Sequence, residues 1–510
     1  MCGVMGKKMF PKKDKSIAQR RKAQTKGAKK YDPASFGART FSLQPFASFL
    51  CAFALQRESF PSLLISLVAL ILLNFATPTR AQSTASIATP AASPERARAV
   101  AELYAEAESY ARKKYEAFER EGIGYDQKLV EQVEREQRAL AARYAAEVSA
   151  RESLSAKEVL QLGQLYNIAE DGERAVATMF RFLTEHSQSA SIQDKQTARY
   201  VIALQTAKRG ALADAEIALA DYLKVAAPDA DEQRYRLETA LAASYRTQRK
   251  PEAAIAHARA AFEAAKQLHA HTPLDTATRD AVFYRTLSFI SDAALDLKRT
   301  DESIAALQEL RRLSVSFPSA DLYRRATLLL GRIVPAVAYV SKPDDPLFRV
   351  ETGARLAPEI AVADWIEQKP ATLRSLRGRV VLLDFWALWC TPCHAALPHI
   401  AEWQEKYKER GLSVVALTEY RNAVNGQRVR TPQEVGELRS FKRASRLPFG
   451  FAVADTTATA DAYGVTTIPV AVLIDRRGVV RFLNVGAHDT DIAELEQMIV
   501  RLLDEKDSDK

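Results

Sequence analysis

Residues 379–393 read RVVLLDFWALWCTPC. The β-branched and leucine-rich run at 379–385 predicts a buried strand. Pro392 is well tolerated in the first turn of a helix, so a helix is expected to begin at the cysteines. This order places Cys390 at a helix N-terminus, where free N–H groups and the helix dipole stabilise a thiolate. Cys393, one turn deeper, is expected to be the buried resolving thiol, and the pattern therefore predicts a redox-active pair.

Strand and helix patterns alternate around this stretch, between residue 357 and the end of the chain. Further strands are expected at 412–417, 470–474 and 479–483, and helices at 392–410, 432–444, 456–463 and 491–503. Alternation of this kind is typical of a layered sheet with helices packed on it. The sequence therefore predicts an α/β domain at 357–510.

Three segments of this domain carry a family resemblance. They are LLDFWALWCTPC at 382–393, the lead-in APEI at 357–360 with TLRSLRGRVVLLDFW, and YGVTTIPVAVLIDRRGVVRFLNVG at 463–486. In order and spacing they resemble the thioredoxin superfamily, and most of all its exported TlpA/ResA-like thiol–disulfide oxidoreductases. The resemblance spans 357–503 and implies a thioredoxin-like fold.

The resemblance also implies roles for single residues. Cys390 matches the nucleophile and Cys393 the resolving cysteine. Asp384 matches the buried acid near the resolving thiol, and burial should raise its pKa. Pro469 matches a cis-proline that packs beside the disulfide.

Aromatic residues and client contacts follow from the same comparison. Trp386 and Trp389 match aromatic positions that shield the cysteine pair. The residues expected to bind the client are Trp389, Thr391, Pro392, Ile468 and Pro469.

Other interpretations of the cysteine motif are weaker. Cys390, Cys393 and His394 together also spell a c-type haem attachment site, but an apolar strand precedes them and no Met follows until Met498. Two cysteines without a second ligand pair do not make a typical zinc site. We therefore expect no cofactor and no metal. A thiol peroxidase would carry a Thr where Ala387 stands.

One position departs from the family pattern. Ala396 stands where many family members have a Glu shortly after the second cysteine. Any specificity in cytochrome maturation that depends on that Glu is left open for this chain.

The N-terminal region carries the excess of positive charge. Residues 1–40 hold twelve Lys and Arg against two Asp, and residues 41–81 add one net positive charge. The formal net charge of +9 therefore leaves −2 for residues 82–510, which gives no reason to expect nucleic acid as a partner.

A basic extension at 1–57 precedes an export segment at 58–81, within which PSLLISLVALILLNFA is uncharged. Its length lies between that of a signal-peptide core and a membrane-spanning helix, so cleavage and anchoring both stay open. The charge asymmetry places the rest of the chain outside the cytoplasm, in a periplasmic location. Of the four cysteines only Cys390 and Cys393 lie beyond this segment, which favours redox chemistry over structural bridges.

A Ser/Thr/Ala/Pro-rich linker at 82–94 leads into 95–340, which is rich in Ala, Leu, Glu and Arg and is expected to be helical throughout. Its first part predicts a long antiparallel pair at 99–121 and 126–151. Later helices align at Val176, Ile217, Ile255 and Ile304, and they resemble tetratricopeptide (TPR) repeats with stretched spacing. Such repeats bind peptides or proteins. A Pro-bearing linker at 341–356 ends the region.

The sequence thus predicts a multidomain α plus α/β protein, with a TPR-like helical region before a thioredoxin-like domain. Its expected function is that of an exported thiol–disulfide oxidoreductase acting on protein clients. The family resemblance favours a reductase fed by a membrane electron donor. The alternative is a helical protein-binding scaffold whose thioredoxin-like domain mainly binds; the intact cysteine pair with Asp384 and Pro469 counts against it.

Overall fold

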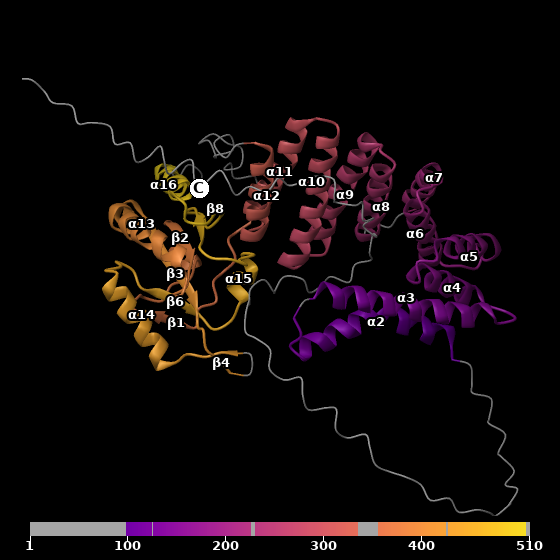
Figure 1. The fold of residues 1–510 in the computed structure, drawn as a ribbon, viewed down its shortest axis with the longest axis horizontal. Coiled ribbons are helices and arrows are strands. Elements are labelled where there is room, and N and C mark those ends of the chain that lie inside the picture. Colours follow the sequence, from indigo (N-terminus) through magenta and orange to yellow (C-terminus); the bar gives the residue numbers. More distant parts are fainter. Residues whose placement is uncertain (1–97, 125, 226–229, 335–354, 425–426, 506–510) are drawn as a thin grey trace, which may run out of the picture. The chain divides into compact units, whose positions relative to one another are not determined.

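The computed structural model describes residues 98–124, 126–225, 230–334, 355–424 and 427–505 (Figure 1). The predicted basic extension, export segment and 82–94 linker lie outside these residues, as does all of the 341–356 linker except its last two positions. Among the helices of the described ranges, none combines the length and apolar character that crossing a membrane requires.

The described part of 98–334 is built from helices, which confirms the predicted helical region. The helices are α2 (Val100–Arg120), α3 (Gln127–Ser149), α4 (Ala156–Ile168), α5 (Gly172–Glu185), α6 (Ile192–Lys208), α7 (Leu212–Leu223), α8 (Asp231–Thr247), α9 (Pro251–His271), α10 (Thr276–Asp296), α11 (Thr300–Ser316) and α12 (Ala320–Ile333). The predicted first pair is α2 and α3, and Gln137 of α3 donates to the carbonyl of Ala107 of α2 at 2.9 Å.

The aligned repeat positions fall on α5, α7, α9 and α11, as expected, but they are not equivalent in burial. Ile255 is 4% exposed, whereas Ile217 is 70% exposed. Each of the four helices has a fully buried small residue just before the aligned one, but not at the same offset: Ala175, Ala254 and Ser303 come one residue before it, and Ala215 comes two residues before it. The helix pairs are therefore present, and their assignment to the TPR class stays a prediction.

The C-terminal domain contains a six-stranded sheet in the order β1-β6-β3-β2-β7-β8. Its strands are β1 (Asp364–Ile366), β2 (Val380–Phe385), β3 (Leu412–Glu419), β6 (Phe451–Ala454), β7 (Val470–Ile474) and β8 (Val480–Val485). β2 and β6 run parallel to β3, whereas β1, β7 and β8 run antiparallel to their neighbours β6, β2 and β7. The four predicted strands are confirmed as β2, β3, β7 and β8, and β1 and β6 were missed.

The remaining elements connect the strands. They are η4 (Arg374–Leu376), α13 (Thr391–Tyr407), η5 (Lys408–Arg410), the short pair β4 (Ala423–Val424) and β5 (Gln427–Arg428), α14 (Pro432–Ala444), α15 (Ala458–Ala462) and α16 (Asp489–Asp504). The four helices predicted for this domain correspond to α13 to α16. The fold is thus the predicted α plus α/β arrangement.

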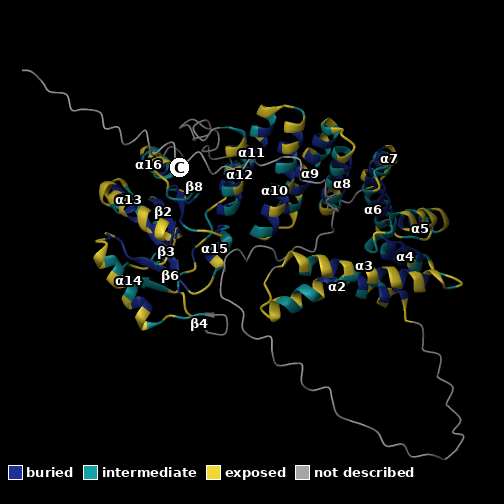
Figure 2. Cartoon of the chain, in the orientation of Figure 1, coloured by how far each residue is buried: buried dark blue, intermediate teal, exposed yellow. Residues whose placement is uncertain are grey.

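Every residue of the central strands β2 and β7 is buried, so the sheet is covered on both faces there. Figure 2 colours each residue of the cartoon by its burial. Successive side chains of a strand point to opposite faces. Leu382 of β2 packs in a cluster with residues of α13, α14 and α16, whereas Leu383 packs in a second cluster with residues near α15. That second cluster also contains Val315, Ala320 and Tyr323 from the end of the helical region, so the two regions share a core.

Candidate active site

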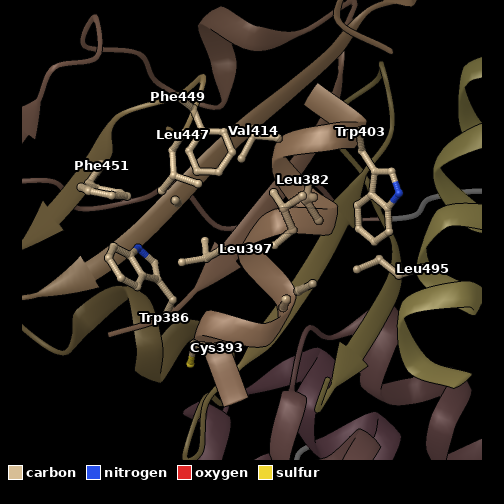
Figure 3. Close-up of a cluster of buried hydrophobic side chains, with 14 of the residues drawn as sticks. Leu382, Trp386, Cys393, Leu397, Trp403, Val414, Leu447, Phe449, Phe451 and Leu495 are labelled. Carbon is tan, nitrogen blue, oxygen red and sulfur yellow. The ribbon is translucent and has the colours of Figure 1, made fainter. Parts of the chain in front are cut away.

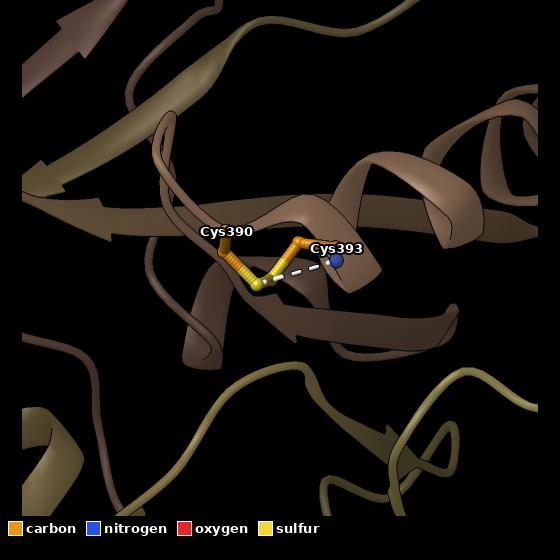
Figure 4. The surroundings of a disulfide bond; sticks show 2 residues. All are labelled: Cys390 and Cys393. Atoms are coloured by element: carbon orange, nitrogen blue, oxygen red, sulfur yellow. Dashed lines mark hydrogen bonds between the residues drawn. A yellow bond between two sulfur atoms is a disulfide. The ribbon is translucent and has the colours of Figure 1, made fainter.

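The two cysteines form a disulfide at the beginning of α13 (Figure 4). Cys390 is the N-cap residue, and its Sγ accepts a hydrogen bond from the backbone N–H of Cys393 at 3.2 Å. The first N–H groups of a helix have no partner within the helix, so the N–H of Cys393 can donate a hydrogen bond to this sulfur. The same donor would stabilise negative charge on Cys390 after reduction. The predicted placement of the pair at a helix N-terminus is therefore observed.

The disulfide is covered, whereas the residues beside it are exposed. Cys390 is 3% exposed and Cys393 is 1% exposed. Trp389 is 64% exposed, and Thr391 and Pro392 also lie at the surface. Sequence reasoning gave no indication that Cys390 itself would be buried in this oxidised state. Trp389, Thr391 and Pro392 are thus the exposed residues next to the buried sulfur atoms in the sequence.

Asp384 lies in the middle of the sheet. It is 2% exposed and pairs in register with Ala416 of β3 and Ala471 of β7. By alternation along β2 its side chain points to the face that α13 covers, which is the face of both cysteines. Burial raises the pKa of Asp384 to about 7. A carboxyl group in this state can hold or release a proton near neutral pH.

Trp386 belongs to the core beneath the disulfide. It is 2% exposed, and its ring centroid lies 4.6 Å from that of Phe451 and 5.4 Å from that of Phe441. Figure 3 shows it next to Cys393 in the cluster that α13 covers. Its buried indole N–H has no acceptor among the described residues. Trp386 is therefore a core residue in the same buried cluster as the two cysteines.

Phe441 was not identified from the sequence. Besides Trp386, its ring contacts His394, with centroids 4.9 Å apart. His394 is an exposed residue of α13, and its ring packs against that of Phe441. The available signal was the apolar position of Phe441 within the helix predicted at 432–444.

Pro469 closes the segment that leads from α15 to β7. The Ile468–Pro469 peptide bond is cis, and Pro469 is buried. Ile468 packs against both clusters of the domain, including the one that contains Cys390 and Cys393. The structure thus brings the cysteines, Asp384, Trp386 and Ile468 to one side of the sheet.

The described residues contain no group of three or more His, Cys, Asp or Glu side chains arranged to hold a metal ion. At the position where many family members have a Glu, Ala396 is 6% exposed and packs in the core beside the cysteines. The two sulfur atoms of the Cys390–Cys393 disulfide can take up two electrons on reduction.

Comparison with known proteins identifies the C-terminal domain. Residues 354–483 match the AhpC/TSA family. Thiol-disulfide oxidoreductase ResA of Bacillus cereus (strain ATCC 10987 / NRS 248) is 30% identical over 140 residues, which are 28% of this chain and 70% of that protein. Protein DipZ of Mycobacterium tuberculosis (strain CDC 1551 / Oshkosh) is 33% identical over 180 residues, which are 33% of this chain.

The matches cover the relatives to different extents. This chain spans 24% of the length of DipZ and 63% of the length of ResA of Bacillus anthracis. The crystal structure of a thiol-disulfide isomerase from Corynebacterium glutamicum is 23% identical, with 29% of this chain and 98% of that chain covered and a TM-score of 0.25.

Proposed function

Because the chain belongs, through its C-terminal domain, to the ResA-like thiol–disulfide oxidoreductases, we propose that it exchanges disulfides with protein clients through Cys390 and Cys393. The observation that carries the proposal is the disulfide at the N-terminus of α13, where the Cys393 N–H faces the Cys390 sulfur. A helix N-terminus lowers the pKa of a cysteine and makes it an effective nucleophile and leaving group.

The proposed direction is reduction of the client. The Cys390 thiolate attacks one sulfur of a client disulfide, the S–S bond breaks, and the second client sulfur leaves as a thiolate that takes up a proton. Cys393 loses its proton and attacks the Cys390 sulfur of the mixed disulfide, which releases the first client sulfur as a thiolate. Two electrons pass to the client, and the Cys390–Cys393 disulfide seen here is the product. A dithiol donor, proposed to lie in the membrane, must reduce it again.

Asp384 is the proposed proton acceptor for Cys393. The resolving thiol must lose its proton within an apolar core, where water is excluded. A carboxyl group on the same face of the sheet as Cys393, with a pKa of about 7, is suited to accept that proton at neutral pH. Pro469 and Ile468 are proposed to border the client backbone, since Ile468 packs in the same cluster as the cysteines.

The proposed location is outside the cytoplasm. The basic and apolar pattern of 1–81 supports export, with the chain either anchored or released. In an oxidising compartment a reductase needs its own electron supply, which agrees with a membrane donor. The helical region is proposed to dock a client or a partner. The alternative, a scaffold that binds without redox turnover, remains the second candidate.

The full chain, equilibrated in glutathione or dithiothreitol buffers and read by thiol trapping, should show one two-electron transition. A midpoint near about −270 mV would support a reductase, and one near about −120 mV would indicate a disulfide donor. Hydrogen peroxide is the second probe, and rapid consumption of it would favour a peroxidase. Absence of any two-electron transition would reject exchange and leave the scaffold candidate.

Replacement of Trp389 by Ala is expected to raise KM for oxidised insulin about tenfold, because exposed aromatic side chains contribute strongly to protein contacts. The side chain is 64% exposed, so the unfolding temperature and the reduction potential should stay unchanged. Leu356→Ala is the control, since Leu356 is 52% exposed, pairs with Val479 of the same domain and is not part of the proposed site. Equal KM values for the two variants would contradict a role of Trp389 in client binding.

A further inference from the structure

The loop 463–469 joins α15 to β7 and ends at Pro469. Within it, Thr466 and Thr467 are exposed, whereas Ile468 packs against the cluster that contains both cysteines. One side of this loop therefore borders the proposed client site. Its other side contacts the helical region.

That contact is made by the first turn of α12. The backbone N–H of Ala320 donates to the carbonyl of Tyr463 at 2.9 Å, and the N–H of Asp321 donates to the carbonyl of Gly464 at 2.9 Å. The first N–H groups of a helix lack partners within the helix. Here two loop carbonyls satisfy them, so α12 and the loop complete each other's backbone hydrogen bonding.

Gly464 makes the close approach feasible. Its φ is +55°, and a Cβ at this position would lie 2.5 Å from Oγ and 3.0 Å from Cα of Ser319. Any larger side chain would push the loop away from α12. Thr466 adds a side-chain contact, since its Oγ1 donates to Oδ1 of Asp321 at 3.2 Å.

Buried hydrogen bonds and an ion pair fix the position of the first turn of α12. Ser319 is fully buried, caps α12 by accepting from the N–H of Leu322 at 3.1 Å, and donates its hydroxyl to Asp280. Asp280 in turn pairs with Arg279 at 2.7 Å. Further along α12, Tyr323 packs its ring against Phe482 of β8, with centroids 6.4 Å apart. The loop 463–469 therefore contacts a turn whose position is fixed by these interactions.

We propose that the first turn of α12 positions the loop 463–469 for client binding, so that the helical region sets the affinity of the redox domain for protein disulfides. This inference rests on the proposed exchange activity and adds a positioning role for Ser319 and Asp321. A small disulfide should contact little of the loop 463–469, whereas a protein client should contact a larger part of it. The contact should therefore govern KM for proteins and leave the sulfur chemistry unchanged.

The test uses Gly464→Ala in the full chain, with Gly411→Ala as the matched control. Both glycines have positive φ, but Gly411 is at +105° and its added Cβ would meet only the Arg476 side chain at 3.7 Å. The control therefore has at least the same backbone strain without the clash. Insulin serves as the protein probe, oxidised glutathione as the small disulfide, and dithiothreitol as the electron source.

We expect Gly464→Ala to raise KM for insulin about fivefold or more, because small displacements of positioning groups have large kinetic effects. The rate with oxidised glutathione and the reduction potential should match those of Gly411→Ala. Hydrogen exchange should show the Asp321 amide protected in the control and released in Gly464→Ala. A released amide with an unchanged KM for insulin would overturn the proposal.

If Gly464→Ala does not fold, two less disruptive substitutions at Thr466 provide the test. Thr466→Val removes the hydroxyl that Asp321 accepts, whereas Thr466→Ser keeps it. KM for insulin should rise about twofold in the first variant and stay unchanged in the second. Equal KM values would count against positioning by α12. A wild-type chain that reduces neither insulin nor glutathione would instead reject the proposed function itself.

Discussion

Replacement of Cys393 by Ser is expected to give a protein that reacts once with a disulfide client and then stays covalently attached to it. Cys390 keeps its place at the N-terminus of α13, so its thiolate still attacks the client. No second thiol is left to attack the mixed disulfide, and turnover should fall by at least about 1,000-fold. Non-reducing gels and intact-mass spectrometry should detect the adduct.

The control is Cys390→Ser, which should form no adduct and show no turnover. Both cysteines are buried, but Cys390 is the N-cap residue of α13 whereas Cys393 lies inside its first turn, so Cys393 should not reach a client. An adduct through Cys393 at the yield seen for the other variant would reverse the assigned roles. The double variant, with both cysteines replaced, reports any binding without exchange and so tests the scaffold candidate.

Much of the redox domain could be predicted because its signals are local. β2, β3, β7 and β8 are short β-branched runs buried on both faces, and each lies within two residues of its predicted range at both ends. α14 begins at Pro432 and ends at Ala444, where the sequence predicts it, because a Thr cap and a proline fix its beginning. The position of the cysteine pair followed from the same order of strand, turn and helix.

The missed strands lack such signals. β1 has three residues and pairs at the sheet edge with β6, which has four. Segments this short show neither alternation nor a long apolar run, and only their pairing makes them strands. Their existence depends on tertiary contacts, which the sequence does not display.

Burial around the disulfide was equally hard to predict. Trp386 and Trp389 lie three residues apart, yet one is 2% and the other 64% exposed. Trp386 extends the buried face of β2, whereas Trp389 lies on the turn just before α13. The family resemblance assigned both to shielding the pair, and only the fold separates a core residue from a surface residue.

The contact between α12 and the loop 463–469 leaves almost no trace in the sequence. Its main hydrogen bonds use backbone N–H and C=O groups, which every residue except proline supplies. Gly464 was the only visible sign, and a glycine after a short helix is common for other reasons. For the same reason the helical region could be predicted as helical but not as part of the redox domain's core.

Replacement of Asp384 by Asn is expected to stabilise the protein at high pH. The pKa of Asp384 rises from 3.8 to about 7 on folding because burial disfavours the charged form. A group with a raised pKa contributes full stability below its unfolded pKa, and that contribution falls as pH rises through the folded value. Between about pH 4 and pH 7 the wild type should lose about 4 kcal/mol of unfolding free energy that the Asn variant keeps.

Burying the Asn amide costs part of this gain, so we expect the variant to be about 2 kcal/mol more stable at pH 8. Denaturant unfolding between pH 4 and pH 8 gives the measurement. Asp364→Asn is a control of opposite sign. Although burial raises the pKa of Asp364, hydrogen bonds from Arg430 and Tyr420 outweigh it and hold that pKa below its usual value. The control should be less stable than the wild type across this whole range, because the contribution of the ionised Asp364 is lost only below its ordinary pKa of 3.8.

Activity should change in the opposite direction. If Asp384 accepts the proton of Cys393, its loss should slow release of the client from the mixed disulfide by about 100-fold, and the inflection near pH 7 should disappear from the rate profile. A variant that was merely misfolded would lose stability and activity together. An Asp384→Asn protein that is more stable yet slow to release its client would therefore separate a proton-transfer role from a structural one, whereas unchanged release kinetics would leave Asp384 without a part in the reaction.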